Sequence, residues 1–69
     1  MGEQILERLF HLRKKQADVI KELIKRGYKT TAPEFSRMLN GITATKKTEI
    51  ILNAAEDIID QWEKERQGK

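Results

Sequence analysis

The residues with the most evident chemistry lie in one stretch in the middle of the chain. Hydroxyl, carboxylate and cationic side chains occur there close together: Lys29, Thr30, Thr31, Glu34, Arg37, Thr43, Thr45, Lys46 and Lys47. An arginine can donate two hydrogen bonds to guanine O6 and N7, and a glutamate can accept one from cytosine N4. Lysine and threonine side chains commonly bind phosphate. This set therefore predicts recognition of DNA, with α-helical presentation in the major groove, rather than the making or breaking of covalent bonds.

Residue types that support catalysis or metal binding are sparse. The 69 residues include no cysteine and a single histidine, His11. The chain therefore has no thiolate nucleophile, no disulfide and no cluster of histidines for a metal. Its four glycines are too scattered to form a phosphate-binding glycine loop. An enzyme is the least supported class, and we expect no cofactor, no metal and no small-molecule substrate.

The charge is distributed unevenly along the chain. Residues 13–47 contain ten Lys or Arg and three acids, whereas residues 48–69 contain three bases and six acids. The net charge of the whole chain is only +3. A basic segment carried on a scaffold is expected of a polyanion-binding protein. A solvated helical face explains such a lysine-rich segment equally well.

A short helix is predicted over residues 32–39. Thr31 and Glu34 have the spacing of a capping box, in which each side chain bonds the backbone N–H of the other residue. Pro33 is typical of a helix start. Phe35 and Leu39 are four residues apart and are expected to face the core.

The rest of this helix should face outward. We expect Pro33, Glu34 and Arg37 to point away from the core, and Met38 is a further candidate for the outer face. Asn40 and Gly41 both tolerate the left-handed conformation that ends a helix.

The elements before this helix are predicted from apolar periodicity. The pattern from Glu3 to Arg26 fits one helix of about 24 residues, or two helices broken around residues 14–17, where polar residues interrupt the pattern. Gly27 is the expected stop. Tyr28 in the following turn is predicted to anchor the helix junction, and the alternative is a direct phosphate contact.

A long helix is predicted over residues 46–65, capped by Thr45. Its apolar face is broad enough to cover the other helices and, near Trp62, to contact a second chain. Residues 65–69 are expected to be frayed. Residues 1–69 thus predict one all-α domain, a bundle of three or four helices, or five with a broken first helix.

Sequence features of membrane or export segments are missing. No apolar run approaches the roughly 20 residues of a membrane span, and the N-terminus has no apolar signal-peptide core. We expect an intracellular, cytoplasmic protein without a membrane partner.

The segment Phe35 to Gly41, F-S-R-M-L-N-G, resembles the end of the recognition helix in Cro/C1-type helix-turn-helix regulators of temperate phages and mobile elements. The following helix is similar to the family helix that closes the core. The connection between the two motif helices, residues 27–31, is about two residues longer than is usual in the family. The resemblance implies a helix-turn-helix-like domain in which Arg37 faces DNA while Phe35 and Leu39 fill the core.

If the chain binds DNA, the chemistry of each outward residue suggests a role. Thr30 and Thr31, with the N–H groups at the helix start, would bind a phosphate. Glu34 would accept from cytosine N4 or complete the capping box, and Pro33 would contact a thymine methyl or serve only as a helix start. Arg37 would donate to guanine O6 and N7 or else to phosphate. The clamp on the DNA backbone would consist of Lys29 on one side and Thr43, Thr45, Lys46 and Lys47 on the other, and the alternative for the last two is a solvated helix start.

The function expected from these features is transcriptional regulation by sequence-specific binding to double-stranded DNA. In this family a homodimer binds paired half-sites about one helical turn apart. The alternative is an antirepressor-like modulator that pairs with a repressor and blocks its DNA contacts, and a third possibility is an antitoxin-like module. Exposure of Phe10 and Met38 would favour the modulator, because a protein partner needs an apolar surface.

Overall fold

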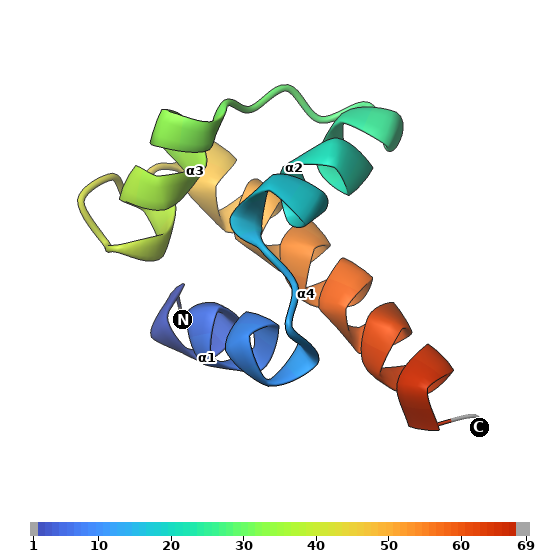
Figure 1. Cartoon of the computed structure of the whole chain (residues 1–69). Helices are drawn as coiled ribbons and strands as arrows, with labels where there is room; N and C mark the ends of the chain where they lie inside the picture. Colours follow the sequence, from blue (N-terminus) through green and yellow to red (C-terminus); the bar gives the residue numbers. More distant parts are fainter. Residues whose placement is uncertain (1, 68–69) are drawn as a thin grey trace.

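The described part of the chain folds into four helices, and Figure 1 shows their arrangement. The computed structural model describes residues 2–67, and its helices are α1 (Gly2–Leu12), α2 (Gln16–Lys25), α3 (Ala32–Leu39) and α4 (Lys46–Gln67). The predicted all-α bundle is confirmed, and residues 2–67 include no strand. None of these helices is long and apolar enough to cross a membrane.

The long first helical region is broken into α1 and α2, one of the two arrangements that the sequence left open. At the end of α1, the Arg13 N–H donates to the Phe10 carbonyl at 3.1 Å and the Lys14 N–H donates to the Leu9 carbonyl at 3.0 Å. Arg13 itself has φ of 57°. These bonds form a Schellman motif, which usually has glycine at the left-handed position. This turn contains no glycine or proline, so the residue types alone did not predict it.

Replacement of Arg13 by glycine should stabilise the protein. An L side chain in the left-handed region is strained, and glycine removes that strain while adding some freedom to the unfolded chain. We expect a net gain of roughly 0.5–1 kcal/mol, which corresponds to a rise in Tm of a few degrees for a domain of this size. Thermal unfolding followed by circular dichroism measures the change.

Gly27 provides the matched control for this substitution. It occupies the same position after α2 with φ of +94°, and a Cβ atom there would meet no atom within 4 Å. Gly27→Arg should therefore lower Tm for conformational reasons alone. A lower Tm for Arg13→Gly would contradict the account of the break.

The core lies between the four helices and is filled from each of them. Its buried apolar side chains are Ile5 and Leu9 of α1, Val19, Ile20 and Leu23 of α2, Phe35, Met38 and Leu39 of α3, and Ile51, Leu52, Ala54, Ala55, Ile58 and Ile59 of α4. As Figure 1 shows, α4 begins behind α2 and α3, and its C-terminal end projects away from α3. Helix α3 is therefore held near the N-terminal end of α4.

The turns after α2 and α3 repeat the same motif with glycine. Tyr28 donates its N–H to the Leu23 carbonyl at 2.9 Å, and Ile42 donates to the Arg37 carbonyl at 3.0 Å. Gly41 has φ of +74°. Tyr28 also packs against the core, as predicted for an anchor. The ends of α2 and α3 could therefore be predicted from Gly27 and Gly41.

Polar contacts fasten α1 to the C-terminal half of α4. Arg8 forms ion pairs with Asp60 and Glu63, and its side chain is 29% exposed. Hydrogen bonds from the guanidinium to Glu63 and then to Asp60 raise the pKa of Arg8 above its ordinary value. Arg66 adds a hydrogen bond to the His11 carbonyl at 2.8 Å. Residues 65–67, predicted to be frayed, continue α4, and residues 68–69 lie outside the described part of the chain.

Candidate nucleic-acid interface

Helix α3 is held by three inward side chains rather than the two expected. Phe35, Met38 and Leu39 are 0%, 3% and 2% exposed. The suggestion that Met38 faces outward was wrong, because a residue three positions from Phe35 lies on the same side of a helix. Pro33 and Arg37 are exposed as predicted. They are four residues apart, so they share the outer face of α3.

The start of α3 confirms half of the predicted capping box. Thr31 has extended backbone angles, and its Oγ1 accepts a hydrogen bond from the Glu34 N–H at 3.4 Å. The Glu34 carboxylate does not accept the second hydrogen bond of the capping box, from the Thr31 N–H. Its Oε1 lies 2.8 Å from Nζ of Lys47 at the start of α4, an ion pair by distance without the geometry of a hydrogen bond. A partner on another helix has replaced the local backbone contact.

The residues proposed to bind phosphate beside this cap differ in exposure. Lys29 and Thr31 are exposed. Thr30 is only 7% exposed, and its hydroxyl oxygen has no hydrogen-bond partner among the described residues. A buried hydroxyl cannot reach a DNA phosphate, so the predicted role of Thr30 is corrected to a position beneath the surface.

A hollow of about 510 Å³ brings several of these residues together. The α2–α3 hollow is lined by Ile24, Gly27, Tyr28, Lys29, Thr30, Thr31, Glu34 and Lys47. The hollow lies between the end of α2, the start of α3 and the start of α4. Lys29, Thr31, Glu34 and Lys47 thus gather on one part of the surface, although Lys29 and Lys47 were expected on opposite sides of α3.

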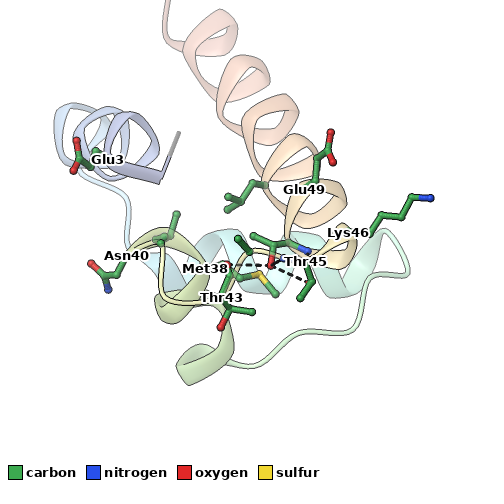
Figure 2. A pocket seen from close by; sticks show the side chains of 12 residues that line it. Glu3, Met38, Asn40, Thr43, Thr45, Lys46 and Glu49 are labelled. Carbon is green, nitrogen blue, oxygen red and sulfur yellow. Dashed lines mark hydrogen bonds between the residues drawn. The ribbon is translucent and has the colours of Figure 1, made fainter.

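The start of α4 is capped by Thr45, as predicted. Thr45 Oγ1 accepts from the Thr48 N–H, and Thr48 Oγ1 accepts from the Thr45 N–H, both at 3.3 Å. The Thr48 hydroxyl is also within 3.3 Å of the Thr43 carbonyl, to which it can donate. Figure 2 shows this hydrogen-bonded group beside Met38. These bonds fix the loop that positions Lys46 and Lys47.

A second hollow, of about 850 Å³, lies between the end of α3 and the start of α4. The α3–α4 hollow is lined by Glu3, Met38, Leu39, Asn40, Gly41, Thr43, Ala44, Thr45, Lys46, Thr48, Glu49 and Leu52. The carboxylates of Glu3 and Glu49 would repel a phosphate inside it. Figure 2 shows that the Lys46 side chain extends away from the hollow. Lys46 is therefore available to a ligand outside the hollow, whereas the interior is not a phosphate site.

The basic segment of the sequence does not form a single surface. Lys14 lies over the ring of Trp62, with Nζ 5.1 Å from the ring centre. Trp62 and Lys47 are separated by about 22 Å along the axis of α4. Lys14 therefore lies near the end of the molecule remote from α3, and it covers part of the tryptophan that was predicted to contact a second chain.

One exposed residue beside α3 was given no role by the sequence. Ile42 follows the turn at Gly41 and is 74% exposed. An isoleucine within a segment of threonines and lysines is the signal that could have pointed to it. Asn40, also exposed, donates from Nδ2 to the Ser36 carbonyl at 2.9 Å, so its side chain serves the end of the helix.

The outer face of α3 thus offers Pro33 and Arg37, and the neighbouring residues Thr31, Lys29 and Lys46 are also exposed. The described residues hold no group of three or more His, Cys, Asp or Glu that could bind a metal ion. Comparison of the chain with protein-family models, curated proteins and solved structures finds no match.

Proposed function

We propose that the protein is a sequence-specific DNA-binding regulator of transcription, of phage or mobile-element type, that places α3 in the major groove. The observation that supports this most is the outer face of α3. Its inner side chains are buried, while Arg37 is exposed and forms no ion pair with any residue in the range 2–67. An α-helix, about 10–12 Å across with its side chains, fits the major groove, which is about 12 Å wide.

The groups beside α3 suit a DNA backbone. Lys29 precedes the helix, the exposed Thr31 caps it, and Lys46 extends from the start of α4. Backbone N–H groups at a helix start and nearby cations both favour phosphate. In this proposal Arg37 reads a base while these groups fix its register on the duplex.

A homodimer acting in the cytoplasm completes the proposal. One short helix reads few bases, and a pair of subunits related by twofold symmetry reads two half-sites. The half-sites would lie roughly 34 Å apart, one turn of the double helix. Occupancy of the operator would control transcription without any chemical step.

Selection from a random duplex library tests the proposal. The wild-type protein should enrich one sequence in repeated rounds, as two related half-sites spaced by about ten base pairs. Phe10→Ser should enrich the same sequence, because Phe10 lies on α1 beside His11, whose carbonyl is bound by Arg66 at the far end of α4. Failure of the wild type to enrich any sequence would contradict the proposal.

Exposure of Phe10 supports a second candidate function, the antirepressor-like modulator. Phe10 is 80% exposed, although Met38, the other residue expected to be exposed in such a protein, is buried. A modulator of this kind should lower the DNA affinity of a small phage-type repressor and should bind no DNA itself. Phe10→Asp should remove that effect, because a carboxylate disfavours an apolar interface.

A further inference from the structure

The ion pair between Glu34 and Lys47 occupies a special place on this surface. Among residues 2–67 it is the one ion pair that joins α3 to another helix. Nζ of Lys47 lies 2.8 Å from Oε1 of Glu34, and the two side chains are 55% and 38% exposed. Oε1 is closed to solvent, so Oε2 is the carboxylate oxygen left to accept a hydrogen bond from a ligand.

The pair changes what each residue can offer to DNA. An isolated carboxylate at the start of α3 would repel the phosphates on both sides of the groove. The ammonium of Lys47 cancels that charge. In return, Lys47, which was predicted to bind phosphate, is paired with Glu34.

We infer that Glu34 and Lys47 act together as a specificity element: Glu34 accepts a hydrogen bond from cytosine N4, and Lys47 is the positioning residue that neutralises and orients the carboxylate. This inference rests on the proposed function. A carboxylate is an acceptor that suits the exocyclic amino group of cytosine. Because the acid is neutralised within the protein, the contact adds base preference without repelling the DNA backbone.

A contribution to folding alone is a weak explanation of the pair. Partly exposed ion pairs typically contribute about 0–1 kcal/mol to stability. The position of Glu34 also offers it a bond to the Thr31 N–H in a capping box, and the side chain turns toward α4 instead. The arrangement therefore holds the carboxylate beside the start of α4 rather than at the Thr31 N–H.

A double-mutant cycle on DNA affinity tests the inference. The variants are Glu34→Gln, Lys47→Met and the combination of both, each measured on the duplex selected by the wild type over a range of salt concentrations. Lys47→Met should weaken binding about tenfold when Glu34 is present, because it leaves the carboxylate unneutralised. In the Glu34→Gln background the same substitution should weaken binding less than about twofold, because no charge then needs a partner.

The base preference gives a further readout. Glu34→Gln should also shift the preference at one position from cytosine to adenine, since glutamine pairs with adenine N6 and N7. A residue that serves only the fold would change none of these readouts.

Two substitutions serve as controls. Lys46→Met removes the neighbouring ammonium, which has no ion-pair partner among the described residues, and should weaken binding by the same factor in both backgrounds. Lys47→Arg retains the charge and should bind within about twofold of the wild type. Thermal unfolding of every variant establishes that the fold is intact.

The outcomes separate this inference from the proposed function. If Lys47→Met weakens binding by the same factor with Glu34 and in the Glu34→Gln background, Lys47 is an ordinary phosphate contact, and the inference is overturned while DNA binding stands. If the wild type binds no duplex at low salt, the proposed function itself fails and the inference fails with it.

Discussion

Replacement of Phe35 by alanine should unfold much of the protein at room temperature. Phe35 is fully buried at the centre of α3, where it holds the helix against the rest of the core. Removal of a buried phenylalanine side chain costs roughly 3–5 kcal/mol. A single core in a chain this small rarely gives more than about 3–5 kcal/mol of net stability, so the loss is comparable with the whole.

Denaturant unfolding followed by far-UV circular dichroism measures this effect. Ile42→Ala is the matched control, because Ile42 is 74% exposed and its truncation should change the free energy of unfolding by less than about 0.5 kcal/mol. Similar midpoints for the two variants would show that Phe35 does not hold α3 as described.

Replacement of Arg37 by alanine should weaken DNA binding strongly without affecting the fold. Arg37 is exposed on the outer face of α3, so its side chain contributes little to packing. A bidentate contact from arginine to guanine is worth about 1–3 kcal/mol, which corresponds to a loss of roughly 5- to 150-fold in affinity. The preference for guanine at one position should be lost as well. Binding to the selected duplex and to its single-base variants measures both effects.

Arg13→Ala provides the matched control for Arg37→Ala. Arg13 carries the same charge, but it lies in the turn between α1 and α2 and precedes Lys14, whose ammonium lies over the Trp62 ring. Its loss should leave the base preference unchanged and reduce affinity less than about threefold, because salt screens distant charges. An equal effect of the two substitutions would indicate general charge attraction rather than base reading by α3.

Helix α3 and its neighbours could be predicted from the sequence because local chemistry specifies them. Thr31 and Pro33 fix the start of α3, Gly41 fixes its end, and Thr45 caps α4. Each of these signals acts within one turn of the chain. The predicted bounds of α3, residues 32–39, are the observed ones.

The break between α1 and α2 depends on packing and was left open for that reason. A straight helix over residues 3–26 would be about 36 Å long, and its two halves could not both face one small core. The break allows Leu9 and Val19 to be buried together with α3 and α4. Arg13 adopts a positive φ as a consequence, which no local preference of arginine would suggest.

The predictions for Glu34 and Thr30 at the proposed site also failed because packing between helices decides where these side chains lie. The side chain of Glu34 could bond its own helix start or a residue on another helix, and the outcome depends on where α4 begins. Burial of Thr30 likewise depends on how the connection between α2 and α3 lies over the core. Sequence patterns within one element do not contain this information.

The measurement that tests the central claim most directly is the salt dependence of binding between the wild-type protein and duplex DNA. Lys29, Arg37 and Lys46 are exposed on or beside α3. If each contacts a phosphate or releases a counterion, log K should fall with log salt with a slope of about −3 per subunit. Binding that is absent at low salt, or that does not change with salt, would contradict the proposal that this surface recognises DNA.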